Sequence, residues 1–129
     1  MAEYDKTILI VDDEPDILDY LKAFFEDNGF KTLTAKDGKE CMQLAMDKKP
    51  DLITLDISMP EQSGVKTYRD LQDSDETKNI PIVVITGVTG EFKKFISTRK
   101  QVDPPTSYFE KPIDREKLLE DIKNILKLN

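Results

Sequence analysis

Short apolar runs alternate with amphipathic segments about five times along the chain. The run at Thr7–Val11 has the apolar character of a strand that is buried on both faces of a sheet. The run at Lys31–Ala35 is more polar, which favours a place at the edge of the sheet. This alternation predicts an α/β fold, in which helices cover both faces of a parallel sheet.

Turn and capping residues set the expected ends of the helices. Pro15 suits the first helical turn, and Asn28-Gly29 supplies a left-handed stop. Asp114 is a good N-cap for a last helix that runs to the end of the chain. The full pattern predicts strands at 7–11, 31–35, 51–55, 80–85 and 107–110, and helices at 15–27, after the turn at 37–38, after the loop at 59–64, at 91–101 and from 114 onward.

Length and composition predict one globular domain. The chain has 129 residues, of which 38% are hydrophobic and 35% charged, and no apolar stretch is long enough to span a bilayer. The charged segment before residue 8 is too short to contain the core of a signal peptide. We therefore expect a cytoplasmic protein in which residues 1–129 form a single domain with no membrane contact.

Charge and missing residue types exclude several function classes. A net charge of −7 disfavours direct binding to nucleic acid, and the basic cluster at residues 93–100 is more typical of an exposed helix face than of a binding site. Because the chain has no histidine, Ser-His-Asp hydrolysis and histidine general-base catalysis are excluded. The one cysteine, Cys41, cannot form an internal disulfide and is expected to pack in the core.

Polar residues follow four of the predicted strands. Asp12 and Asp13 follow the first strand, Asp56 the third, Thr86 the fourth and Lys111 the fifth. Ligands bind beyond the carboxyl ends of strands in such sheets, so we expect these side chains to lie together. Three carboxylates at one edge repel one another unless a cation joins them or some are protonated. Oxygen ligands without histidine or cysteine favour Mg²⁺, Ca²⁺ or Mn²⁺, and open positions favour Mg²⁺ with a phosphate.

The same residues suit phosphoryl transfer. Lys111 supplies a positive charge opposite the acids, and Thr86 offers a hydroxyl to a phosphate oxygen. Asp56 is then the carboxylate that can act as nucleophile, as in the formation of an aspartyl phosphate. Each residue also has a structural alternative, because Asp12 or Asp13 can open a helix, Thr86 can end a strand and Lys111 can be a solvated lysine. An acid directly after a buried strand is harder to explain without a partner.

The chain resembles the receiver domains of two-component signalling over essentially its whole length. The resemblance implies a flavodoxin-like α/β fold, with a doubly wound five-stranded parallel sheet of order 2-1-3-4-5 and five helices. It also implies a single receiver domain with no output domain. The blocks that carry it, all present and in order, are Ile8–Pro15, Asp51–Pro60 with Gly64, Ile82–Gly87 and Tyr108–Pro112.

The resemblance implies a role for each residue of the site. Asp56 is the implied phosphoacceptor, which takes a phosphoryl group from a phosphohistidine with the help of Mg²⁺. Asp12 and Asp13 are the implied acidic pair at the metal, and the backbone carbonyl of Ser58 is implied to complete the coordination. Lys111 is implied to contact the phosphate.

The resemblance also implies a switch and its partners. Thr86 would be drawn toward the phosphoryl group while Tyr108 turns inward, although Tyr108 taken alone is typical of a half-buried aromatic in a strand. The implied consequence is altered binding of a downstream protein at the face formed by the fourth helix, the fifth strand and the fifth helix. The implied phosphodonor is a sensor histidine kinase or a histidine phosphotransfer protein. Such a protein is a switch that catalyses only its own phosphorylation and dephosphorylation, and is not an enzyme for other substrates.

The sequence departs from the usual receiver pattern in three places, and two other protein classes compete with the receiver interpretation. Gly87 stands where alanine is common, residues 88–107 are slightly long and contain Pro104-Pro105, and no output domain follows the last helix. A Mg²⁺-dependent hydrolase of the haloacid dehalogenase kind would carry a second aspartate at the position of Ser58. A flavodoxin-like electron carrier would need a hydroxyl-rich phosphate loop at residues 12–15. The sequence therefore disfavours both classes.

Overall fold

The computed structural model of the chain describes residues 4–56, 63–86, 107–110 and 114–128. The predicted helix at 91–101 lies outside these ranges. The elements within them are β1 (Thr7–Val11), α1 (Pro15–Asp27), β2 (Lys31–Ala35), α2 (Gly38–Lys48), β3 (Leu52–Leu55), α3 (Ser63–Asp73), β4 (Ile82–Thr86), β5 (Ser107–Glu110) and α5 (Arg115–Ile125).

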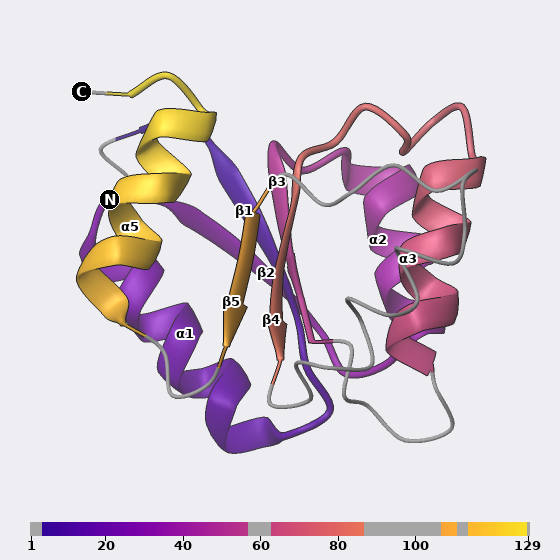
Figure 1. Ribbon diagram of the computed structural model, residues 1–129, viewed down its shortest axis with the longest axis horizontal. Helices are drawn as coiled ribbons and strands as arrows, with labels where there is room; N and C mark the ends of the chain where they lie inside the picture. The colour runs from indigo at the N-terminus through magenta and orange to yellow at the C-terminus, as the bar shows by residue number, and fades with distance from the viewer. Residues whose placement is uncertain (1–3, 57–62, 87–106, 111–113, 129) are drawn as a thin grey trace.

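The strands form one parallel sheet of five in the order β2-β1-β3-β4-β5. The predicted order is therefore confirmed, and the polar strand β2 does lie at an edge. Figure 1 shows α1 and α5 on one face of the sheet and α2 and α3 on the other. The chain runs from β1 to β2 on one side and then returns to β3 on the other side, so the strand order reverses between β1 and β3, where sheets of this kind bind ligands.

The core has two halves, one on each face of the sheet. Successive side chains of a strand point to opposite faces, so β1 sends Ile8 and Ile10 to the half beneath α1 and α5, and Leu9 and Val11 to the half beneath α2 and α3. All four of these side chains are at most 2% exposed. Burial on both faces explains why the central strands are continuous apolar runs in the sequence.

Helix ends follow the capping signals in the sequence. Pro15 begins α1, and Gly29 after its end has a left-handed φ of 94°. Asp37 caps α2 by accepting the backbone N–H of Glu40 at 2.8 Å, and Asp114 caps α5 in the same way. None of the described helices is long and apolar enough to cross a membrane.

Some element ends differ from the prediction. Strand β4 begins at Ile82 instead of residue 80, because Pro81 has no N–H to donate to the ladder. Strand β3 begins one residue late, at Leu52, and α3 begins at Ser63, inside the predicted loop. Helix α5 ends before the chain does, at a turn in which Lys127 has a left-handed φ of 59°.

Candidate functional site

The two acids that follow β1 and β3 are fixed by hydrogen bonds of their own backbone. The N–H of Asp12 donates to the carbonyl of Ala35 at 3.1 Å, at the end of β2. The N–H of Asp56 donates to the carbonyl of Val11 at 3.0 Å, at the end of β1. Each acid thus continues the sheet ladder by one residue, and the sheet register sets where its side chain begins.

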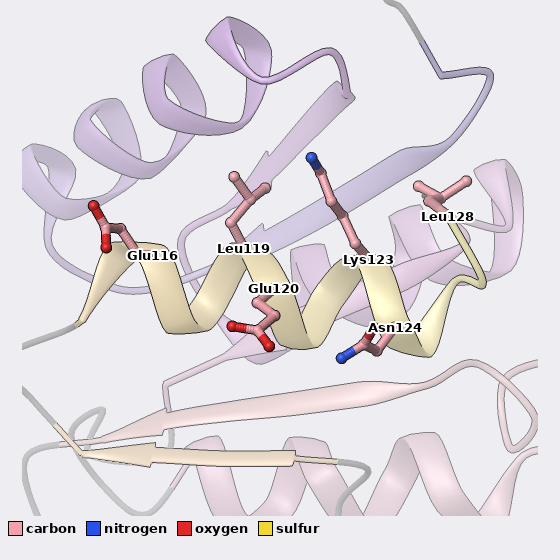
Figure 2. A pocket seen from close by; sticks show the side chains of 6 residues that line it. All are labelled: Glu116, Leu119, Glu120, Lys123, Asn124 and Leu128. Carbon is pink, nitrogen blue, oxygen red and sulfur yellow. The ribbon is translucent and has the colours of Figure 1, made fainter.

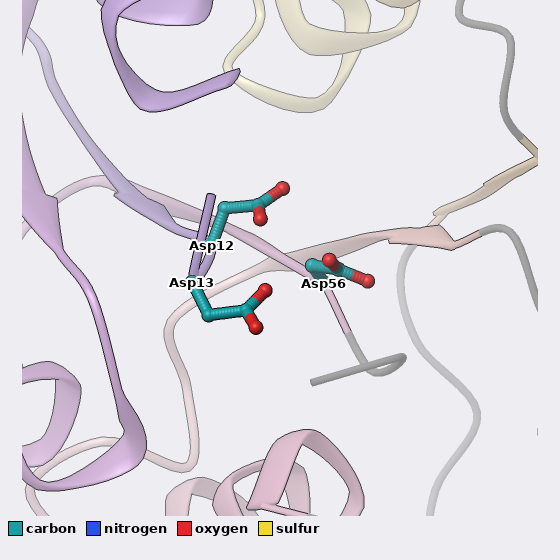
Figure 3. Close-up of side chains that lie close together, drawn as sticks. All are labelled: Asp12, Asp13 and Asp56. Carbon is teal, nitrogen blue, oxygen red and sulfur yellow. The ribbon is translucent and has the colours of Figure 1, made fainter. Parts of the chain in front are cut away.

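Asp12, Asp13 and Asp56 form one acidic cluster, in which one carboxylate oxygen from each residue lies within 4.8 Å of the others. Figure 3 shows the three carboxylates side by side beyond the ends of β1 and β3. Asp12 and Asp56 are each only 2% exposed, whereas Asp13 is exposed. The expectation that these three acids meet is therefore confirmed, and the cluster opens to solvent at Asp13.

The cluster has the chemistry of a site for a hard divalent cation. Two buried carboxylates and one exposed carboxylate at this separation repel one another when ionised, and a cation between them removes the repulsion. The donors are oxygens only, which suits Mg²⁺ or Ca²⁺ and not the softer metals that prefer sulfur or imidazole. The residues present therefore fit the predicted metal ion.

The structural alternative for the first two acids holds in part. The Oδ1 atom of Asp12 accepts the backbone N–H of Glu14 at 3.0 Å, so this carboxylate does support the entry into α1. The N-cap itself is Glu14, whose side chain makes no capping hydrogen bond, so Asp13 is not the cap. Asp12 therefore has a structural role as well as its place in the cluster, and helix capping does not explain Asp13.

The other predicted site residues are only partly placed. Thr86 is the last residue of β4 and pairs with Glu110, at the same carboxyl end of the sheet as the acids. Tyr108 lies within β5 opposite Val84. Ser58 and Lys111 lie outside the described residues. The roles of these four residues stay predictions.

Sequence reasoning missed Thr54, which lies in β3 two residues before Asp56. Thr54 is 1% exposed, and among the described side chains its Oγ1 is the one buried polar atom that has no hydrogen-bond partner. A comparable buried threonine, Thr77, donates its hydroxyl to the carbonyl of Leu71 at 2.7 Å. The signal in the sequence was a single hydroxyl inside the apolar run Leu52–Leu55.

Cys41 is part of the core and has no role in the site. Its side chain is fully buried beneath α2. Burial, and then the negative charge of Asp37, raise the pKa of the Cys41 thiol to about 12. A thiol that keeps its proton is a poor nucleophile, so the prediction of core packing is confirmed.

In the described part of the chain, two grooves are lined by residues other than the three acids. One, of about 330 Å³, runs along α5, and Figure 2 shows the side chains around it. The other, of about 460 Å³, lies where α2 meets α3. The first is lined by Glu116, Leu119, Glu120, Lys123, Asn124 and Leu128, and the second by Asp37, Gly38, Lys39, Met42, Lys66, Thr67 and Asp70.

Comparison with known families decides the class of the protein. Residues 8–123 match the family model of the response regulator receiver domain. The chain belongs to this family. This receiver domain is 36% identical to the protein PilH of Pseudomonas aeruginosa over 119 residues, which cover 92% of this chain and 96% of PilH. It is 31% identical to the polar-differentiation response regulator DivK of Brucella anthropi over 121 residues, which cover 94% of this chain and 96% of DivK.

Solved receiver structures share the fold. A CheY-like receiver domain protein of Methanospirillum hungatei superposes with a TM-score of 0.82 at 27% identity, covering 96% of this chain and 95% of that one. The chemotaxis response regulator CheY4 of Vibrio cholerae superposes with a TM-score of 0.79 at 26% identity, covering 95% and 99%. The resemblance found in the sequence is therefore confirmed, and this chain is a receiver domain of the response regulator kind.

Proposed function

We propose that this receiver domain accepts a phosphoryl group on Asp56 and then changes its affinity for a downstream protein. The donor is a phosphohistidine on a sensor histidine kinase or on a histidine phosphotransfer protein, and the reaction takes place in the cytoplasm. The observation that carries the proposal is the position of Asp56, a buried acid at the carboxyl end of the middle strand, with Asp12 and Asp13 within 4.8 Å.

The acidic cluster provides the metal site of the proposal. Asp12, Asp13 and Asp56 would hold Mg²⁺, with the backbone carbonyl of Ser58 completing the coordination. When bound, Mg²⁺ supplies positive charge that offsets the negative charge on the transferring group. The sheet contributes rigidity, because the backbone N–H groups of Asp12 and Asp56 are both tied to neighbouring strands. The exposed position of Asp13 gives an ion access to the cluster.

Asp56 acts as the nucleophile of the proposed reaction. One of its carboxylate oxygens attacks the phosphorus, the bond from phosphorus to the imidazole nitrogen of the donor breaks, and the electron pair of that bond stays on the imidazole. Phosphoryl transfer depends chiefly on positioning and on stabilising negative charge. Lys111 contacts the phosphoryl oxygens from the end of β5, and the Thr86 hydroxyl donates to one of them.

The proposed output lies on the face that β5 and α5 would form with the helix predicted at residues 91–101. Thr86 moves toward the phosphoryl group and Tyr108 turns inward, which shifts the population of two states of this face. The domain remains a switch that catalyses only its own phosphorylation and dephosphorylation.

Intact-mass spectrometry after incubation with acetyl phosphate tests the proposal. We expect the mass of one phosphoryl group to be gained by the wild type with Mg²⁺, and no gain with EDTA or for Asp56→Asn. Asp51→Asn is a matched control, because Asp51 precedes β3 at the opposite end of the sheet and the new amide oxygen can still accept the N–H of Thr7. Labelling of Asp56→Asn, or no labelling of Asp51→Asn, would contradict the assignment.

Two further variants separate metal binding from phosphate contact. Asp13→Ala removes a carboxylate of the cluster and is expected to weaken Mg²⁺ binding. Lys111→Ala is expected to keep the Mg²⁺ affinity but to impair phosphorylation, because the ammonium meets the phosphoryl group and not the metal. The roles would be wrongly assigned if Lys111→Ala lost Mg²⁺ binding, or if Asp13→Ala kept it unchanged.

A further inference from the structure

The Thr54 hydroxyl lies among aliphatic side chains, in the half of the core beneath α1 and α5. Register pairs Thr54 with Ile10 on β1 and with Val83 on β4, and both neighbours are buried aliphatic residues. Valine has almost the same shape and would fill the position without a polar atom. A buried hydroxyl without a hydrogen bond loses its hydration and gains no interaction in return, which destabilises the fold. A threonine here therefore indicates either a tolerated cost in stability or a functional role for the hydroxyl.

The place of Thr54 in the sheet directs attention to the acids. Successive side chains of a strand alternate between faces, so Thr54 and Asp56 point to the same face, and Asp12 continues the row of Ile10 on the neighbouring strand. The backbones of two such residues are about 6.6 Å apart along the strand, which is farther than one hydrogen bond of about 2.8 Å reaches, so a water molecule between the side chains can link them. The hydroxyl thus lies one side-chain layer below the acidic cluster.

We propose that Thr54 is a positioning residue for this cluster, which holds a water molecule between its hydroxyl and the carboxylates of Asp12 and Asp56. Such a water would have three polar partners, the number that buried waters typically have. By hydrogen bonding to the oxygens that face away from the cation, it fixes the two carboxylates in the orientation in which they bind Mg²⁺. The inference rests on the proposed Mg²⁺ site, and it gives Thr54, which lies one side-chain layer below the acids, a role in orienting the ligands of that site.

The test compares Thr54→Val and Thr54→Ser with the wild type. Valine keeps the shape and removes the hydroxyl, whereas serine keeps the hydroxyl and removes the methyl group. Mg²⁺ affinity is measured by NMR titration of backbone amides with MgCl₂ at constant ionic strength. Urea unfolding in EDTA checks that both variants fold. We expect Thr54→Val to bind Mg²⁺ about tenfold more weakly, since loss of a residue that orients metal ligands has effects of this size. Thr54→Ser should stay within about twofold of the wild type.

The outcomes distinguish this inference from the proposed function. Equal Mg²⁺ affinity of the wild type and Thr54→Val would overturn the role of Thr54 and leave the Mg²⁺ site intact. Equal weakening by Thr54→Ser and Thr54→Val would overturn it too, because shape and not the hydroxyl would then matter. A wild type that neither binds Mg²⁺ nor gains a phosphoryl group from acetyl phosphate would reject the proposed function, and the inference with it.

Discussion

Neutralising Asp56 should make the metal-free protein more stable. The oxygens of Asp12, Asp13 and Asp56 lie within 4.8 Å of one another, and two of the three acids are almost completely buried. Two unit charges at this distance repel by about 3.5 kcal/mol at an effective dielectric constant of about 20, and by about 0.9 kcal/mol in bulk water. Asp56→Asn relieves the repulsion from buried Asp12 and a screened repulsion from exposed Asp13. We expect a gain of roughly 1–4 kcal/mol in the free energy of unfolding.

Urea unfolding at pH 7 and low salt, with EDTA, measures this gain. Asp13→Asn should stabilise less than Asp56→Asn, because water screens the charge of an exposed group. Asp19→Asn is the matched control, since it makes the same chemical change on an exposed position of α1 and should shift stability by less than about 0.5 kcal/mol. Mg²⁺ at 100 times its dissociation constant should stabilise the wild type by about 2.7 kcal/mol, and should stabilise Asp56→Asn less at the same concentration.

The result that refutes the electrostatic reasoning is simple to recognise. If Asp56→Asn unfolds at the same urea concentration as the wild type, or at a lower one, the three carboxylates do not strain the metal-free fold. The same conclusion holds if raising the salt concentration leaves the difference between Asp13→Asn and the wild type unchanged, because repulsion at an exposed group must be screened.

Three further predictions concern the scaffold. Because the pKa of Cys41 is raised in the fold, the folded thiol stays protonated at a pH where the unfolded thiol ionises. The free energy of unfolding, relative to that of Cys41→Ala, should therefore fall between pH 9.0 and about 12 by about 1.4 kcal/mol per pH unit, as measured by urea unfolding at several pH values. The same pH dependence of stability in both proteins would contradict this. Asp114→Ala removes the cap of α5 and should lower stability by about 1 kcal/mol, whereas Asp114→Asn should preserve it; equal losses would show that the hydrogen bond to Lys117 is unimportant. Gly29→Ala forces alanine into a left-handed conformation and should lower the thermal midpoint through a loss of about 1–2 kcal/mol; an unchanged midpoint would mean that the turn rearranges.

Much of the fold could be predicted because it depends on local signals. The central strands are apolar on both faces, and such runs are easy to distinguish from the amphipathic helices between them. Pro15, Gly29 and Asp114 mark helix ends through their own backbone preferences or capping groups, which do not depend on distant contacts. The sheet order required the family resemblance as well, since strand pairing is a property of the whole chain.

Part of the site was not predictable because it depends on neighbours that the sequence does not place. Asp12 and Asp13 are adjacent, yet one is buried and the other exposed, because the hydrogen bond from the N–H of Asp12 extends the sheet ladder to Asp12, whereas Asp13 lies beyond it. Thr54 is an ordinary residue for a strand, where threonine is common. Only its pairing with Ile10 and Val83 in the sheet shows that its hydroxyl is isolated.

The two backbone hydrogen bonds that tie Asp12 to β2 and Asp56 to β1 fix these two acids independently of the loops that follow them. The carboxylates belong to the frame of the sheet, so the connections beyond them can change in length and composition without displacing the acids. One acidic cluster can therefore be combined with many different recognition surfaces. For protein engineers, this receiver domain offers a scaffold in which loops could be exchanged to redirect signalling while Asp12 and Asp56 stay in place.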